Sequence, residues 1–363
     1  MENRNTPIKK YNKIAFVAGT LGRGGAERQL YYIAGSLVKH GYDISVYCLT
    51  KNEFYQSKLE EVGIPVVYFG EEQSKLKRVS KLIKLLRSDR PQLIYSFHFY
   101  TNTYAGIAGK MLTIPVIGSI RSDAISEKRL NGKMAWFHYS LPDFIVANSE
   151  HGAFNCKRIF YKKKIFVLGN VIDTDLFEFV SKDIHPGSRL NLILVGRFEK
   201  EKQPWLFPEL IKELSDAGVD VKGQMIGEGS FKEETTQLLS RQYSNYNISV
   251  YDAHPEIHEV YKNAHWLCSL SRYEGTPNVV MEAMASGVGI ASFDYTGIHK
   301  LIENDSTGVL GNNIKGLSSG IIKNSEPASY KKMTLNARNK IVNDYSLKFL
   351  VNRFEELLMK IGA

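Results

Sequence analysis

The feature that most constrains the fold is an alternation of short apolar runs with amphipathic segments, which is interrupted once and then begins again. Such alternation predicts a parallel sheet with helices wound over both faces. The first series predicts helices at Ala26–Lys39 and 75–87 and strands at Ile14–Val17, Ile44–Leu49, Leu93–Tyr95, Val116–Ser119, Phe144–Ala147 and Phe166–Leu168. The second predicts helices at Trp205–Ala217 and 231–241 and strands at Leu192–Val195, Val221–Ile226, Ile248–Tyr251, Trp266–Leu270 and Gly289–Phe293.

The interruption, Ser181–Arg189, is polar and rich in turn-forming residues, so we expect it to be a linker. An α/β chain of 363 residues is long enough for two domains of ordinary size. We therefore expect two doubly wound, Rossmann-like domains, residues 1–183 and 190–345, and a terminal segment, residues 346–363, with a helix at about Ser346–Met359. Because such folds bind ligands at the carboxyl ends of their strands, we expect the domains to face a central cleft.

One segment, residues 271–287, combines a strand end, a glycine-containing loop and the start of a helix. Thr276 fits the N-cap position, Pro277 the first helical position and Gly287 the helix end. The positive helix end and its backbone N–H groups predict an anion site. Glu274 and Glu282 lie on either side of this site, and carboxylates accept hydrogen bonds from hydroxyl groups. An anion site between two hydroxyl acceptors suits a sugar nucleotide.

Further candidates follow other predicted strands. Arg197 and Lys202 come after Leu192–Val195, where cations would bind phosphate oxygens. His98 comes after Leu93–Tyr95 and is either a structural histidine beside aromatic residues or a functional group at the cleft end of this strand. Asn102 and Arg121 have weaker claims at the same rim.

The loop Gly22–Gly25 resembles a dinucleotide-binding fingerprint only in part. Gly22 and Gly24 have the right spacing, but Glu27 stands where the third glycine or alanine belongs. We interpret Gly24 and Gly25 as a close-approach loop beside a phosphate or an acceptor, rather than as a dinucleotide site.

Together these residues resemble the GT4 family of retaining glycosyltransferases, which have the GT-B fold and a Glu-x7-Glu motif. The resemblance implies that Glu282 holds the ribose, that Glu274 faces the donor hexose, and that the backbone of Gly275, Thr276, Pro277 and Asn278 lines the diphosphate and sugar. It also implies that Arg197 and Lys202 bind the diphosphate and that the terminal helix packs on the first domain. The element beginning at Asn170 has Val171 where the family usually has glycine, and Lys300 stands where glutamate is usual.

Charge and cysteine usage restrict the partners and the compartment. The net charge is +9, and about +11 falls in residues 1–190, which leaves about −2 for the rest. No basic–aromatic nucleic-acid motif is present, so a diphosphate-linked acceptor or an anionic membrane is the better match. The stretch Lys128, Arg129, Lys133, Trp136 and Phe137 mixes cations with interfacial aromatic residues. Three widely spaced cysteines, Cys48, Cys156 and Cys268, favour buried free thiols in a reducing cytoplasm.

Two other kinds of site are rejected. Asp173 and Asp175 bracket Thr174 and fit a turn better than an oxygen-only metal site, so we expect no metal. Eight helical residues would separate Glu274 from Glu282 by ~12 Å, beyond the ~5–9.5 Å of glycosidase carboxylate pairs.

The sequence therefore predicts a retaining enzyme that moves a hexose or N-acetylhexosamine from a nucleotide sugar, in our interpretation UDP-linked, with no other cofactor. The acceptor would be a saccharide, lipid-linked at the cytoplasmic membrane face, in O-antigen- or capsule-type polysaccharide synthesis. The alternatives are a sugar-nucleotide epimerase or phosphorylase of related fold, and a non-catalytic scaffold in a polysaccharide assembly complex.

Overall fold

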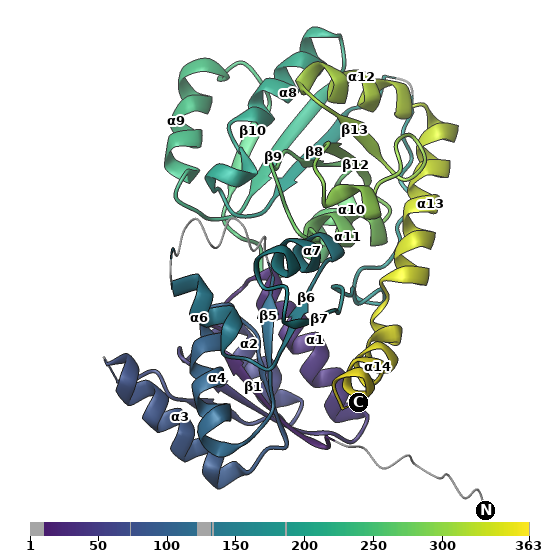
Figure 1. Ribbon diagram of the computed structural model, residues 1–363. Coiled ribbons are helices and arrows are strands. Elements are labelled where there is room, and N and C mark those ends of the chain that lie inside the picture. The colour runs from purple at the N-terminus through teal and green to yellow at the C-terminus, as the bar shows by residue number, and fades with distance from the viewer. Residues whose placement is uncertain (1–10, 73, 122–131, 133, 186, 363) are drawn as a thin grey trace, which may run out of the picture. The chain divides into compact units, whose positions relative to one another are not determined.

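The computed structural model describes residues 11–72, 74–121, 132, 134–185 and 187–362, and divides the chain into two compact units. The first unit holds the chain up to Val171 and again from Lys348, and the second holds Ile172–Leu347. In Figure 1 each unit is a sheet with helices on both faces. This confirms the predicted fold class, two parallel-sheet Rossmann-like α/β domains.

The described part of the first unit contains a seven-stranded parallel sheet of order β3-β2-β1-β4-β5-β6-β7. Its strands are β1 (Lys13–Ala18), β2 (Asp43–Cys48), β3 (Val66–Tyr68), β4 (Leu93–Ser96), β5 (Val116–Ile120), β6 (Phe144–Ala147) and β7 (Lys164–Val167). Its helices are α1 (Gly25–Lys39), α2 (Phe54–Glu61), α3 (Lys75–Asp89), α4 (Thr101–Leu112), α6 (Met134–Ser140), α7 (Glu150–Ile159) and α14 (Leu350–Gly362). The central strands β1 and β4 are buried along almost their whole length, as expected for strands covered on both faces.

The described part of the second unit contains a six-stranded parallel sheet of order β10-β9-β8-β11-β12-β13. Its strands are β8 (Leu190–Val195), β9 (Val221–Ile226), β10 (Ile248–Tyr251), β11 (Trp266–Ser269), β12 (Gly289–Phe293) and β13 (Val309–Gly311). Its helices are α8 (Leu206–Asp216), α9 (Lys232–Gln242), α10 (Ile257–Asn263), α11 (Asn278–Ala285), α12 (Ile314–Asn324) and α13 (Pro327–Asp344). Single 3-10 turns cover Lys200–Lys202, Ile298–Lys300 and Leu347–Phe349.

The chain leaves the first unit earlier than the expected linker. The side-chain amide of Gln29 pairs with both the N–H and the carbonyl of Val171, at 2.9 and 2.8 Å, which fixes this residue to the first unit. Ile172 and Phe177 are already buried in the core of the second unit. The polar stretch Ser181–Arg189 therefore belongs to the second unit.

The terminal helix α14 begins at Leu350, four residues later than expected, and belongs to the first unit. Its Phe354 is buried beside Tyr95 of β4, and its Glu355 accepts a hydrogen bond of 3.1 Å from Tyr42. The chain therefore returns to the first unit at its end. All three cysteines are buried and none forms a disulfide, as predicted for Cys48 and Cys268.

Arg338 of α13 connects three segments of the second unit. Its guanidinium group donates hydrogen bonds to the carbonyl oxygens of Phe177 and Ala285, both at 2.9 Å, and of Thr174, at 3.1 Å. The loop after Ile172 is thereby attached to the end of α11, the helix that contains Glu282.

We predict that Arg338→Ala destabilises the second unit, because three carbonyl oxygens lose a charged donor in a partly buried place. The free energy of unfolding should fall by roughly 1–3 kcal/mol. Urea unfolding followed by circular dichroism measures this change. The control is Asn339→Ala on the exposed face of the same helix, which should change stability by less than about 0.5 kcal/mol. Equal stability of the two variants would show that Arg338 does not hold the loop.

Candidate functional site

The strand order of each sheet selects one place for a ligand. Both sheets contain the order third, second, first, fourth, so the chain leaves the first and fourth strands in opposite directions. These strands are β1 and β4 in the first unit and β8 and β11 in the second. The helices that follow them separate, and a crevice opens at the carboxyl ends of the two strands. The predicted site residues lie in the segments that follow these four strands, except for the weaker candidate Arg121, which follows β5.

In the second unit, the segments after β8 and β11 are joined by a backbone bond and an ion pair. The N–H of Arg272 donates to the carbonyl oxygen of Glu201 at 2.9 Å. Lys202 Nζ lies 2.5 Å from Glu274 Oε2, and the two side chains are only 21% and 16% exposed. The structure thus brings together the cation and the carboxylate that the sequence assigned to a diphosphate and a hexose.

Glu274 is fixed from two further sides. Ser271 Oγ donates to its second oxygen at 2.7 Å. A Cβ atom at Gly297 would lie 2.1 Å from the Glu274 carbonyl oxygen and 2.6 Å from that of Gly275, so only glycine lets the segment after β12 support this loop. Burial, and then the charge of Glu274, raises the pKa of Tyr295, which keeps that hydroxyl protonated. The loop is therefore held in place before any ligand binds.

Arg197 is placed differently from Lys202. Its side chain is 72% exposed and makes a long contact of 3.4 Å with Glu201, four residues further along the chain. Gly196 before it has a φ of +144°, a conformation that favours glycine, and Phe198 after it is fully buried. This alternation presents Arg197 to solvent at the end of β8, with its donors available to a ligand.

Helix α11 begins at Asn278, so the predicted N-cap at Thr276 is wrong by one residue. Pro277 has a φ of −74° and a ψ of 109°, which is extended rather than helical, and no side chain caps the helix from this position. The predicted end is confirmed, because Gly287 follows the helix with a φ of +74°.

Glu282 lies on the second turn of α11 and is 1% exposed. The hydroxyl group of Tyr261, on α10, donates to its Oε2 at 3.0 Å. Glu274 thus lies in the loop before α11, and Glu282 is buried within the helix.

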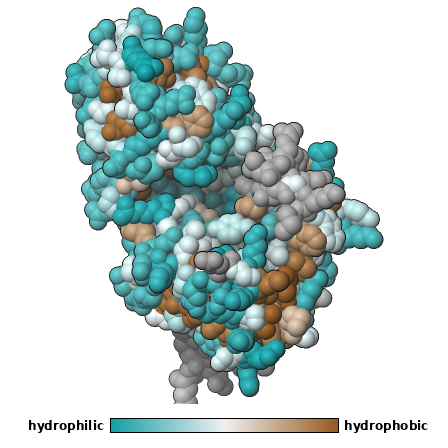
Figure 2. Space-filling model, turned by 90° about the vertical axis from the view of Figure 1, so that its left-hand side faces the viewer, coloured by the Kyte–Doolittle hydropathy of each residue, from teal (hydrophilic) through white to brown (hydrophobic). Residues whose placement is uncertain are grey.

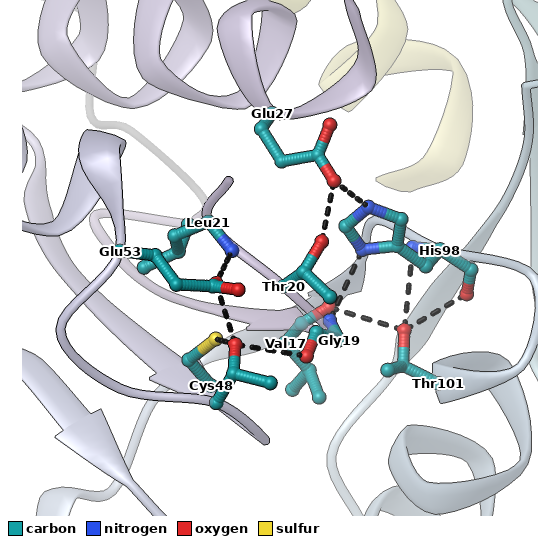
Figure 3. A network of polar contacts seen from close by, with 10 residues as sticks. Val17, Gly19, Thr20, Leu21, Glu27, Cys48, Glu53, His98 and Thr101 are labelled. Carbon is teal, nitrogen blue, oxygen red and sulfur yellow. Dashed lines mark hydrogen bonds and ion pairs between the residues drawn. The ribbon is translucent and has the colours of Figure 1, made fainter. Parts of the chain in front are cut away.

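In the first unit, His98 after β4 contacts Glu27 of α1 (Figure 3). His98 Nε2 lies 3.2 Å from Glu27 Oε1, which also accepts a bond of 2.5 Å from Thr20 Oγ1. The other ring nitrogen, Nδ1, accepts the backbone N–H of Gly19 at 3.1 Å. Burial would raise the pKa of Glu27, but the hydrogen bonds from His98 and Thr20 outweigh burial and lower this pKa, so the carboxylate is ionised.

A second carboxylate, Glu53, fixes the other side of the same loop. It accepts the N–H of Leu21 (Figure 3). It also accepts the hydroxyl group of Thr50. Tyr100 stacks on His98 with ring centroids 5.6 Å apart, and a Cβ atom at Gly19 would overlap its ring. Gly24 is the N-cap of α1 and Gly25 its first residue.

The sequence missed Glu27 and Glu53 as site residues. A signal for Glu27 was present, because this residue is where the dinucleotide fingerprint fails. Asn102 is structural: its amide exchanges two bonds of 3.0 Å with the backbone of Ser119. The guanidinium group of Arg121 stacks on Phe97 at 3.8 Å and bonds Asn170 at 3.3 Å.

Asp173 forms a turn, as predicted, since its Oδ1 accepts the N–H groups of Asp175 and Leu176, both at 3.1 Å. Within the described ranges, no group of three or more His, Cys, Asp or Glu side chains could hold a metal ion. Likewise, none of the described helices is long and apolar enough to cross a membrane. Lys128, Arg129 and Lys133 lie outside the described residues, whereas Trp136 and Phe137 are 58% and 44% exposed.

Two family models match consecutive parts of the chain. The Glycosyltransferase Family 4 model matches residues 23–176, and the model of glycosyl transferases group 1 matches residues 177–340. One relative is the GalNAc-alpha-(1->4)-GalNAc-alpha-(1->3)-diNAcBac-PP-undecaprenol alpha-1,4-N-acetyl-D-galactosaminyltransferase of Campylobacter jejuni, 29% identical over 82% of this chain and 84% of its own length. Another is the amylovoran biosynthesis glycosyltransferase AmsD of Erwinia amylovora, 22% identical over 81% of this chain and 84% of its own.

A solved structure, Anabaena Alr3699/HepE in complex with UDP and glucose, matches with a TM-score of 0.82 at 18% identity, over 96% of this chain and 100% of that one. At this identity the match shows a shared fold, GT-B. The two family models together match residues 23–340, which include parts of both units, and both named relatives are glycosyltransferases. The chain therefore belongs to the GT4 family of glycosyltransferases.

Proposed function

We propose that this glycosyltransferase is a retaining enzyme that moves a hexose or an N-acetylhexosamine from a UDP-sugar to a saccharide acceptor. The observation that carries the proposal is the contact between Lys202 and Glu274 at the strand ends of the second unit. The cation of Lys202 suits the diphosphate that leaves, and the carboxylate of Glu274 suits the hydroxyl groups of the sugar that is transferred. The solved structure with UDP and glucose supports this choice of donor.

Each part of the donor has a partner in this proposal. Buried Glu282 binds the ribose hydroxyl groups, and the backbone at the start of α11, from Gly275 through Thr276 and Pro277 to Asn278, lies along the diphosphate. Arg197 and Lys202 neutralise the diphosphate, and because these cations supply the charge, no metal is required.

The reaction follows from these positions. The bond between the anomeric carbon and the diphosphate oxygen breaks, and a bond from the acceptor oxygen to that carbon forms on the same face. The acceptor proton passes to the departing diphosphate oxygen, so no enzyme nucleophile is needed. Lys202 must exchange Glu274 for the diphosphate when the donor binds, and this exchange leaves Glu274 available to the sugar.

The acceptor in this proposal is a saccharide on a lipid carrier, in O-antigen- or capsule-type synthesis. The name of the Campylobacter relative contains a PP-undecaprenol-linked saccharide, and that of the Erwinia relative contains amylovoran biosynthesis. Figure 2 shows apolar side chains gathered on one face of the first unit, and α6 exposes Trp136 and Phe137. This face and the excess positive charge of the first half suit peripheral contact with an anionic membrane.

The proposal is tested by incubating the protein with UDP-glucose, UDP-galactose, UDP-GlcNAc or UDP-GalNAc and a panel of p-nitrophenyl glycosides. We expect UDP release that depends on the acceptor, and a product with the anomeric configuration of the donor. An epimerase would convert the donor without any acceptor, and a scaffold would convert nothing.

We predict that Lys202→Ala and Arg197→Ala each lower kcat/KM for transfer by about 10²–10³-fold, because the charge of the leaving diphosphate is under-compensated. The matched control is Lys200→Ala, an exposed lysine of the same turn, which should retain normal turnover. Near-normal turnover in both Lys202→Ala and Arg197→Ala would remove the diphosphate assignment.

We expect the two motif glutamates, Glu274 and Glu282, to contribute to different steps, one to transfer and the other to UDP binding. We predict that Glu282→Gln weakens UDP binding roughly tenfold, because a charge-assisted bond to the ribose is lost. Glu274→Gln should bind UDP normally but lose transfer. Calorimetry with UDP and a transfer assay give the two readouts, and an equal loss of UDP affinity in both variants would contradict this division of roles.

We predict that the protein floats with anionic liposomes at low salt and is released at high salt, since each basic residue near such a surface contributes ~1 kcal/mol that salt screens. Replacing Lys128, Arg129 and Lys133 together with serine should reduce flotation and leave UDP affinity unchanged. A wild-type protein that does not float at low salt would exclude the membrane proposal.

A further inference from the structure

Two carboxylates contact the glycine loop of the first unit, and three of its backbone N–H groups already have acceptors within the unit. The N–H of Gly19 donates to His98, that of Leu21 to Glu53, and that of Gly24 to the carbonyl oxygen of Gly22. These three N–H groups are therefore satisfied within the loop. The exposed Arg23 of this loop lies over the ring of Phe54, whereas the carboxylates of Glu27 and Glu53 contact the loop itself. A neutral hydroxyl group therefore suits this loop better than a phosphate.

Glu27 turns back over the loop from the first turn of α1. A Cβ atom at Gly24 would lie 1.9 Å from Glu27 Oε2, so the absence of a side chain at Gly24 makes room for the carboxylate. Oε1 is occupied by Thr20 and His98. In Figure 3 the other oxygen points away from both partners, and the side chain keeps 12% of its surface exposed. Oε2 is therefore the oxygen through which Glu27 can meet a ligand.

His98 has both ring nitrogens engaged. A backbone N–H can only donate, so Nδ1 of His98 must be the unprotonated nitrogen. Nε2 then carries the hydrogen and donates it to Glu27. In this tautomer the ring has no lone pair left for a substrate proton, so His98 orients Glu27 and does not itself take a proton.

We propose that Glu27 is a catalytic residue of the transfer, whose Oε2 accepts the hydrogen bond of the acceptor hydroxyl group that becomes glycosylated, with His98 and Thr20 as its positioning residues. This inference rests on the proposed function and assigns Gly24 and Gly25 to the acceptor side. The carboxylate stays ionised throughout: it aligns and polarises the hydroxyl group. The proton still goes to the departing diphosphate oxygen as the new C–O bond forms and the old one breaks.

The test compares Glu27→Gln with wild type, using the UDP-sugar and p-nitrophenyl glycoside for which wild type is most active. Glutamine keeps the size of the side chain and removes its charge. We expect acceptor-dependent transfer to fall by about 10²–10³-fold, with UDP affinity within twofold of wild type. The matched control is Glu61→Gln, which changes an exposed glutamate at the end of α2. This variant should keep wild-type transfer and wild-type UDP affinity.

Two variants of His98 provide the second part of the test. Because the structure uses its Nε2–H only as a donor to Glu27, His98→Gln, which retains N–H donors, should keep at least tenfold more transfer than His98→Ala. A general base at this position would make both variants equally inactive. The pH profile of His98→Gln should keep the shape of the wild-type profile.

Three results would overturn the inference. They are wild-type transfer by Glu27→Gln, a Glu27→Gln protein that melts far below wild type and so reveals a structural carboxylate, and equal inactivity of the two His98 variants. A wild-type protein that releases no UDP with any donor and acceptor of the panel would instead overturn the proposed function, and this inference with it.

Discussion

The reversal of strand order in each parallel sheet is the constraint on which the site depends. Helices that follow β1 and β4, or β8 and β11, must pass to opposite faces of their sheet, so the loops at those strand ends remain uncovered by their own helices. The buried apolar strands stabilise each sheet, so the residues of these loops can differ between the two units. In both units, polar and charged groups accordingly lie at the same topological position.

The two positions carry different chemistry. In the second unit, Lys202, Arg197 and the start of α11 bring positive charge to the loop that holds Glu274. In the first unit, Glu27 and Glu53 bring negative charge, and side chains or carbonyl groups use the backbone donors of Gly19, Leu21 and Gly24. A diphosphate suits the former and a neutral hydroxyl group the latter. The same fold, used twice, can thus serve a donor and an acceptor.

Much of this could be read from the sequence, because parallel strands buried on both faces are continuous apolar runs. The bounds of β6, β9, β10 and β12 agree with the prediction, whereas the three-residue edge strands β3 and β13 are too short to give a signal. The N-cap of α11 was predicted at Thr276 but lies one residue later, at Pro277, because the backbone of Pro277 is extended. The boundary between the units was missed because Gln29, far away in the sequence, fixes Val171.

Side-chain pairings were harder to foresee. Arg197, Lys202, Glu274 and Glu282 could be named from their places after strands and in the helix, but the ion pair between Lys202 and Glu274 depends on two loops that are distant in sequence. Glu27 was seen only as a departure from a fingerprint. Its partnership with His98 depends on the adjacency of β1 and β4, which the sequence does not specify residue by residue.

Hydrogen–deuterium exchange of the whole protein with and without UDP tests the central claim most directly. If the nucleotide binds at the strand ends of the second unit, UDP will slow exchange in residues 196–202 and 271–287 and leave residues 19–27 unchanged. Protection confined to residues 19–27, with none in the second unit, would contradict the account, because the nucleotide would then bind at the acidic loop assigned to the acceptor.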